Sequence, residues 1–140
     1  MGIKSQSGYS GTPLVRKLGI KSGFVIRIVH QPSPYKDFFP DFPDDVEYAQ
    51  DGIVLVDFVH YFATDAMTLD KELPGLRDQL KQKGMIWISW PKKAARRKTG
   101  LDGNIVRKIG IKHGLVDIKV CSVNEVWSAL KFVIPLKDRK

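Results

Sequence analysis

Cysteine is almost absent from this sequence, with Cys121 as the single example among 140 residues. A lone cysteine cannot form a disulfide within the chain, and it has no Cys or His neighbour at the spacing of metal ligands. We therefore expect no metal site. Because disulfides accumulate in oxidising compartments, we also expect a reducing, cytoplasmic location.

Long apolar runs are also missing, since no stretch of about 18 apolar residues occurs. Residues 1–11 lack the apolar segment of a signal peptide. The sequence thus predicts no association with a membrane. Residues 1–11 are rich in Gly and Ser, which predicts a flexible arm ahead of a single α/β domain over residues 12–140.

Familiar catalytic motifs are absent as well. The sequence contains no Gly-x-Ser-x-Gly motif, no P-loop and no paired-carboxylate pattern. Cys121 lies in a predicted strand, where a packed and inert thiol is commoner than a reactive one. These absences predict no cofactor and favour a protein that is not an enzyme.

Alternating strands and helices are what the sequence does contain. Apolar runs rich in β-branched residues predict strands at 24–30, 52–62, 85–90, 115–123 and 126–134. Three helices are predicted. The first begins at Thr12-Pro13, the second follows from apolar spacing over residues 69–83 and stops at Gly84, and the third begins at Asp102. The alternation predicts a three-layer, mostly parallel Rossmann-like α/β sheet that ends in an antiparallel hairpin.

A ligand site is predicted where the parallel strands end. In open α/β sheets, ligands bind beyond the carboxyl ends of the strands. The residues that we expect at this edge are His30, Gln31, His60, Tyr61, Trp90, Lys92 and Lys93. Lysines and aromatic rings suit a small anionic or aromatic molecule, so the first prediction is a non-catalytic domain that binds a small anionic ligand or a protein partner. The alternative for each histidine is that it only bonds free carbonyls at a strand end.

Charge is unevenly distributed in this basic chain, whose net charge is +8. Residues 37–57 contain seven acidic and no basic side chains, whereas residues 92–98 contain five basic and no acidic ones. The basic residues are Lys92, Lys93, Arg96, Arg97 and Lys98. A second hypothesis is therefore a nucleic-acid-binding protein that uses this basic loop, although no aromatic residue is interleaved with the cations.

Asp57 is a carboxylate within an otherwise apolar predicted strand. If it is buried, it must be paired or have a raised pKa, which would mark a site. The alternative is that the strand boundary is displaced and Asp57 is exposed.

Three stretches carry a resemblance to a known family: GYSGTPLVRKLGIK, GMIWISWPKKAARRKTGLDGN and GLVDIKVCSVNEVWSALKF. Together they resemble the bacterial family catalogued as domain of unknown function 3052, over nearly the whole chain. The resemblance implies no established activity, cofactor or catalytic residue.

The predicted architecture is also similar to the Rossmann-like methyltransferases, which gives a third hypothesis, a divergent methyltransferase-like enzyme. Those enzymes place a Gly-rich turn directly after the first strand, whereas here that strand runs into HQPSPYKD, with two prolines and no glycine. By the same similarity, residues 126–134 should run antiparallel between 85–90 and 115–122. Charge pairing predicts a hairpin register that places Asp117 opposite Lys131 and Cys121 opposite Trp127.

Overall fold

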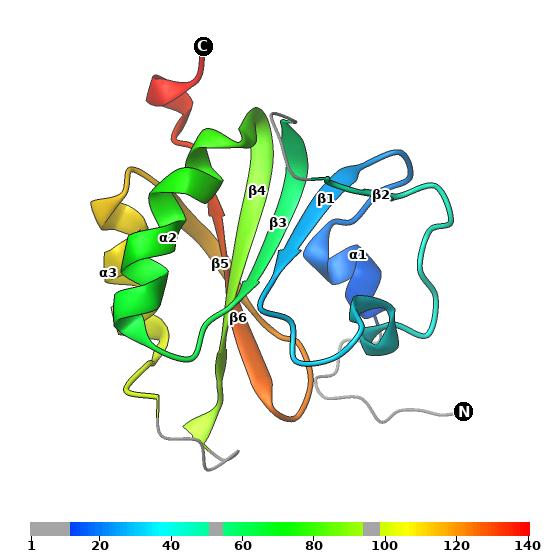
Figure 1. The fold of residues 1–140 in the computed structure, drawn as a ribbon, viewed down its shortest axis with the longest axis horizontal. Coiled ribbons are helices and arrows are strands. Elements are labelled where there is room, and N and C mark those ends of the chain that lie inside the picture. The colour runs from blue at the N-terminus through cyan, green and yellow to red at the C-terminus, as the bar shows by residue number, and fades with distance from the viewer. Residues whose placement is uncertain (1–11, 51–54, 94–98) are drawn as a thin grey trace.

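One mixed sheet organises the chain. The computed structural model describes residues 12–50, 55–93 and 99–140. Within them, six strands form a sheet in the order β2-β1-β3-β4-β6-β5 (Figure 1). The strands are β1 (Val25–Val29), β2 (Glu47–Tyr48), β3 (Val56–Phe62), β4 (Leu80–Pro91), β5 (Val116–Ser122) and β6 (Trp127–Val133). Neighbours pair in parallel from β2 to β4, whereas β6 is antiparallel to both β4 and β5. The predicted fold class is confirmed, and so is the placement of the last strand inside the sheet.

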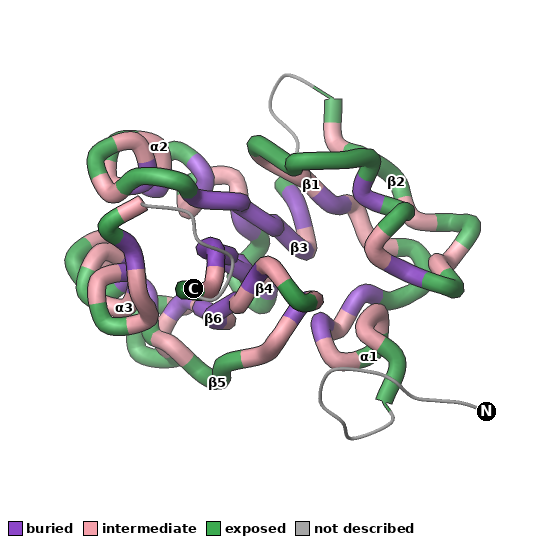
Figure 2. The backbone as a smooth tube through the Cα atoms, turned by 90° about the horizontal axis from the view of Figure 1, so that it is seen from below, coloured by how far each residue is buried: buried purple, intermediate pink, exposed green. Residues whose placement is uncertain are grey.

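Helices cover the two faces of this sheet unequally. α2 (Ala66–Asp78) and α3 (Gly103–Lys112) lie side by side on one face, and α1 (Leu14–Leu18) lies on the other with the 3-10 turn η1 (Tyr35–Phe38) (Figures 1 and 2). Each face has its own core cluster, one mostly aliphatic under α2 and α3, the other rich in aromatic rings under α1. In the described part of the chain, no helix has the length and apolar character that a membrane crossing requires.

The ends of the helices follow from short polar and glycine signals. Asp102 accepts a hydrogen bond from the backbone N–H of Ile105 at 2.9 Å and begins α3, as predicted. Asp65 does the same for α2 through Thr68 at 2.8 Å. Gly19, with a φ of 83°, ends α1 in the left-handed conformation that glycine adopts without strain.

The boundary between α2 and β4 differs from the prediction. The helix ends at Asp78, and Leu80 already pairs with Val56 as the first residue of β4. Gly84 therefore lies within a strand, where a Cβ atom would come within 2.7 Å of a methyl carbon of Leu80. Because glycine has no side chain, Leu80 can pack closely against the backbone of Gly84 within the strand. The helical periodicity of the preceding residues predicted a helix end at this glycine instead.

The register of the terminal hairpin was predicted wrongly. Lys119 lies opposite Lys131, and Cys121 lies opposite Ala129. A bulge between Asp117 and Lys119 inserts one extra residue, so Asp117 is opposite Phe132. The bulge exchanges the two faces of β5 for the residues that precede it. Charge-pairing rules that assume a regular ladder cannot predict this exchange.

Candidate functional site

The carboxyl ends of β1 and β3 form the point where the strand order reverses. From β1 the chain moves outward to β2, and it returns to place β3 on the opposite side of β1. Such a point leaves a crevice above the sheet. A pocket of about 200 Å³ lies there, lined by His30, Tyr61, Phe62, Thr64, Asp65 and Thr68. We call it the switch-point pocket.

Two of the lining residues share one carboxylate. Glu72, on α2, accepts a 2.5 Å hydrogen bond from the Tyr61 hydroxyl and a 2.8 Å hydrogen bond from Nε2 of His30. The rings of His30 and Tyr61 also meet edge to face, with centroids 5.2 Å apart. His30 has a φ of 59°, which is unusual for a residue other than glycine. The left-handed turn and the Glu72 bond together hold its ring beside the pocket.

These contacts keep carboxylates ionised beside the pocket. The hydrogen bonds from Tyr61 and His30 lower the pKa of Glu72. The backbone N–H of Thr68 lowers the pKa of Asp65. Burial and the bond to Glu72 raise the pKa of Tyr61, so its hydroxyl stays protonated. The carboxylate of Asp65 thus lines the pocket and that of Glu72 lies behind His30 and Tyr61, and both carboxylates attract a cationic group rather than an anion.

His60 lies on the other face of β3, because successive strand residues point to opposite faces. It is fully buried, with Nδ1 2.7 Å from the Tyr35 hydroxyl and Nε2 2.6 Å from Oγ of Ser89. Burial lowers the pKa of His60 to about 3, so the ring is neutral. It also stacks on Phe62, with ring centroids 4.3 Å apart. The hydrogen-bonded network itself does not line the switch-point pocket, but Phe62 belongs to both places, since its ring stacks on His60 and also lines that pocket.

The remaining residues of the predicted edge do not join the pocket. Trp90 is packed in the core beneath α2 and α3, whereas Gln31 and Lys93 are exposed. Nζ of Lys92 is bound to Oγ of Ser122 and to the carbonyl oxygen of Asn124, at 2.7 Å each, at the end of the terminal hairpin. The structure thus brings His30 and Tyr61 together and sends the others elsewhere. Of the predicted basic loop, Arg96, Arg97 and Lys98 lie outside the described residues.

Asp57 is partly buried and paired. Its Oδ2 accepts a 2.8 Å hydrogen bond from the backbone N–H of Val25, and its Oδ1 lies 3.1 Å from Nζ of Lys81. Its side chain is 20% exposed. Asp57 therefore ties β1 and β4 to β3, far from the switch-point pocket.

Sequence reasoning missed the acidic residues of the pocket. Glu72 belongs to α2 and Asp65 is the N-cap of that helix, whose start was expected at residue 69 rather than 66. Their local signal was present, because Asp65 is an N-cap residue that directly follows a strand and a short turn. The bond between Glu72 and His30 joins residues 42 positions apart, and no sequence pattern reports it.

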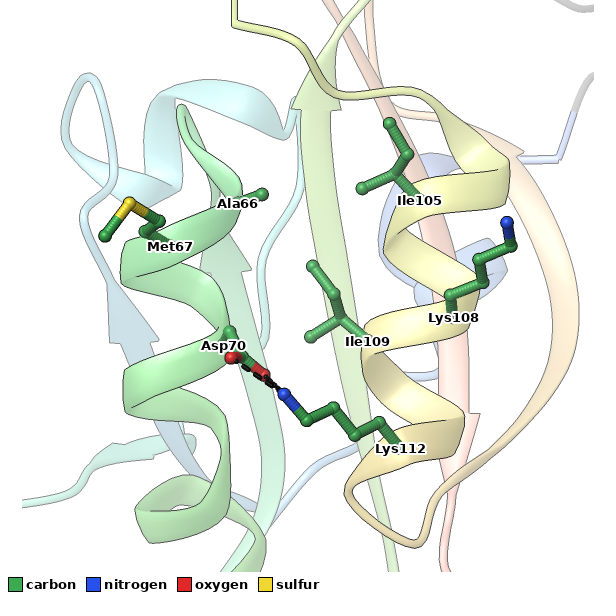
Figure 3. A pocket seen from close by; sticks show the side chains of 7 residues that line it. All are labelled: Ala66, Met67, Asp70, Ile105, Lys108, Ile109 and Lys112. Atoms are coloured by element: carbon green, nitrogen blue, oxygen red, sulfur yellow. Dashed lines mark hydrogen bonds and ion pairs between the residues drawn. The ribbon is translucent and has the colours of Figure 1, made fainter.

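A second, apolar groove runs between α2 and α3. It has a volume of about 330 Å³ and is lined by Ala66, Met67, Asp70, Ile105, Lys108, Ile109 and Lys112. Figure 3 shows Ile105 and Ile109 pointing toward α2, with the Asp70–Lys112 ion pair bridging the helices. Asp70 also accepts a 2.7 Å bond from His113, and these bonds lower its pKa. The groove contains none of the residues predicted for a site. Among the described residues, no three His, Cys, Asp or Glu side chains converge as metal ligands would.

Comparison with known proteins shows the fold. No family model and no curated protein matches the chain, so the resemblance to the domain of unknown function 3052 stays a prediction. Several solved structures share its architecture. A SAM-dependent methyltransferase from Aquifex aeolicus has a TM-score of 0.58 and 16% identity, over 87% of this chain and 88% of that one.

Two further structures agree with it. Precorrin-6y C5,15-methyltransferase from Geobacter metallireducens has a TM-score of 0.58 and 11% identity, over 87% of this chain and 86% of that one. Magnesium protoporphyrin IX methyltransferase from Synechocystis, solved with bound SAM, has a TM-score of 0.55 and 10% identity, over 87% and 74%. The chain thus has a Rossmann-like methyltransferase fold.

These neighbours correct the first functional prediction. The expected non-catalytic domain with a small anionic ligand or a protein partner at its edge is wrong, because structural neighbours over most of the chain are methyltransferases. The pocket adds a physical reason against the anion, since the carboxylate of Asp65 lines it, that of Glu72 bonds to two of its lining residues, and the predicted lysines lie elsewhere.

Proposed function

We propose that this chain is a divergent methyltransferase-like enzyme whose reaction site is the switch-point pocket. The observation that carries the proposal is the antiparallel strand β6 inserted between β4 and β5, an arrangement of the methyltransferase-like sheet, combined with a pocket at its switch point. The His30–Glu72–Tyr61 cluster supplies polar groups at that place.

S-adenosylmethionine is the molecule bound in one structural neighbour, and its chemistry can be compared with the residues of the switch-point pocket. It carries a cationic sulfonium group, and when bound it supplies an electrophilic methyl group. The carboxylates of Asp65 and Glu72 and the ring of Tyr61 suit such a cation. No glycine follows β1, and a volume of about 200 Å³ is small for a whole nucleoside-containing molecule. The pocket therefore fits the cationic end, and the rest must be held without a Gly-rich turn.

The chain's own residues have separable roles in this arrangement. Asp65 and Glu72 hold a positive charge at the pocket. Tyr61, whose hydroxyl stays protonated, donates to Glu72 and fixes the position of that carboxylate. His30 occupies the turn after β1 and donates to the same oxygen of Glu72, Oε1, as Tyr61 does.

The test is ligand binding followed by methyl transfer. S-adenosylmethionine should raise the midpoint of thermal unfolding, because a ligand that binds only the folded state stabilises it by about 2.7 kcal/mol at a hundredfold excess over Kd. Asp65→Asn keeps a good N-cap residue and removes one charge, so it should weaken binding roughly tenfold without unfolding α2. Asp41→Asn makes the same change of charge at an exposed site and should leave binding unchanged.

Activity is read from transfer of a labelled methyl group to fractionated cell extract. The wild-type chain should label an acceptor, and Asp65→Asn with Glu72→Gln should not. If the chain binds S-adenosylmethionine but transfers its methyl group to no fraction of the extract, the proposal that the chain is an enzyme is contradicted. Absence of both binding and transfer would overturn the whole proposal.

A further inference from the structure

The ring of His30 has one nitrogen that its contact with Glu72 leaves free. Glu72 is ionised at neutral pH, because hydrogen bonds from Tyr61 and His30 lower its pKa. An ionised carboxylate only accepts hydrogen bonds, so Nε2 of His30, 2.8 Å from Oε1 of Glu72, carries the proton of the neutral ring. Nδ1 then keeps its lone pair, and within the described ranges it has no hydrogen-bond partner. This nitrogen is therefore available to accept a proton.

Three features hold the ring of His30 in one orientation. Its carboxylate partner, Glu72, is itself fixed by the 2.5 Å hydrogen bond from Tyr61. The ring meets that of Tyr61 edge to face, with centroids 5.2 Å apart. The φ of 59° at His30 is a costly conformation of the kind that recurs at functional sites. A carboxylate that orients a histidine through one nitrogen, and leaves the other free, is the arrangement of a general base.

The position of His30 differs from that of the other two histidines. Its side chain is 50% exposed and lines the switch-point pocket. His60 is fully buried, and both of its ring nitrogens are hydrogen-bonded. His113 also bonds to a carboxylate through Nε2, at 2.7 Å from Asp70, but it lies outside this pocket. His30 is therefore the histidine that can meet a molecule bound at the switch point.

We infer that His30 is the general base of the proposed reaction and that the methyl acceptor is a hydroxyl group, an inference that rests on the proposed function. A hydroxyl is a weak nucleophile until its proton leaves, whereas a carboxylate or a neutral amine already offers an electron pair. The hydroxyl O–H bond breaks and its proton passes to Nδ1. The freed pair on oxygen forms the bond to the methyl carbon, and the pair of the methyl–sulfur bond returns to sulfur. The product is a methyl ether.

The charges around the pocket suit this step. The positive charge of the sulfonium disappears as the methyl group leaves, and an equal charge appears on the ring of His30. Glu72 bonds directly to this ring, and the carboxylate of Asp65 also interacts with it electrostatically. Nearby carboxylates favour the protonated form of a histidine. Both carboxylates therefore stabilise the state in which His30 has taken the proton.

The first measurement needs neither ligand nor activity. Long-range NMR correlations between carbon-bound protons and ring nitrogens of the nitrogen-15-labelled full chain report which nitrogen carries the proton. At a pH above the range in which imidazole titrates, His30 should have its proton on Nε2 and none on Nδ1. A proton on Nδ1 would overturn the inference, because that nitrogen could then only donate.

The second measurement separates the base from the rest of the site. His30→Gln keeps an N–H group that can reach Glu72 but removes Nδ1. Calorimetry should show that S-adenosylmethionine binds this variant nearly as tightly as the wild type, whereas transfer of the labelled methyl group to cell extract should fall about a hundredfold or more. Undiminished transfer would overturn this inference and leave the proposed function standing. A parallel loss of binding would also overturn it, since His30 would then be a binding residue.

Two further variants act as controls. His113→Gln makes the same change in a histidine–carboxylate pair outside the pocket and should leave transfer unchanged. His30→Gly suits the positive φ and leaves space beside Glu72. Added imidazole should restore part of the transfer lost in this variant, whereas pyrazole, a much weaker base of similar shape, should not. Equal effects of the two compounds, including no effect of either, would overturn the inference.

The chemistry of the labelled product identifies the class of acceptor. A methyl ether survives mild alkali and releases labelled methyl iodide with hydroiodic acid. A methyl ester instead releases labelled methanol in alkali, and a methylated amine resists both treatments. An ester or an amine as the main product would overturn the assignment of a hydroxyl acceptor.

Discussion

The two faces of β3 use neighbouring polar residues in opposite ways. His60 is sealed under α1 with Tyr35 and Ser89, whereas Tyr61, the next residue, opens toward a pocket and shares Glu72 with an exposed histidine. Within each cluster, hydrogen bonds of 2.5–2.8 Å join the polar side chains. The difference is access to solvent: the closed cluster keeps its histidine neutral and contributes to stability, and the open cluster retains charge that a ligand can meet.

The largest expected effect concerns the sealed cluster. His60→Ala should lower the free energy of unfolding by about 3–4 kcal/mol, because it leaves a cavity and deprives the buried Tyr35 and Ser89 hydroxyls of their partner. Urea unfolding followed by tryptophan fluorescence measures this. His30→Ala removes the same side chain from the open cluster and should cost less than about 1 kcal/mol. Similar losses from both variants would remove the distinction between the clusters.

The pH dependence of stability sharpens the same comparison. The pKa of His60 is about 3 in the folded chain and near 6.5 in the unfolded chain. The unfolded state therefore binds more protons between these values, and stability that is complete above pH 6.5 is lost as the pH falls. The expected contribution is about 1.4 kcal/mol for each pH unit below 6.5.

Unfolding of the wild type and of His60→Gln between pH 7 and pH 5 isolates this contribution. The carboxylates, His30 and His113 are common to both chains, so their contributions cancel in the comparison. The wild type should lose more stability than the variant. Parallel curves would show that His60 is not protected from protonation by the fold.

Tyr61→Phe tests the open cluster with a smaller effect. It removes the hydroxyl that donates to Glu72, and a hydrogen bond to a charged group contributes about 1.5 kcal/mol. The pKa of Glu72 should rise at the same time, which NMR titration of the carboxyl carbon can follow. Tyr48→Phe, on the exposed strand β2, is the control and should change neither quantity.

The smallest effect is expected at the opposed lysines, where both side chains reach water. Replacing Lys119 with Thr should raise the free energy of unfolding by about 0.5 kcal/mol at low salt, since it removes a like-charge pair and adds a residue that favours strands. The gain should shrink at high salt because screening already weakens the repulsion. A loss of stability, or a gain independent of salt, would contradict the register or its electrostatic cost.

The sequence by itself determined the fold class, the positions of most strands and the start of α3. Local causes are sufficient for these: β-branched apolar runs form strands, and Asp102 caps a helix without help from distant residues. The same local signals failed at Gly84 and at the hairpin. There, strand pairing and a single inserted residue override periodicity and charge, and both depend on what the neighbouring strand does.

The tertiary structure alone decided which polar residues meet. The sequence places His30, His60 and Tyr61 at the carboxyl ends of predicted strands. Successive residues of β3 nevertheless point to opposite faces, so His60 lies on one face and Tyr61 on the other. Glu72 reaches His30 across 42 residues because α2 packs over the end of β1, and Lys119 meets Lys131 because a bulge shifts the ladder. Periodicity assigns a residue to a face, but its partners are set by how elements dock, which depends on the whole chain.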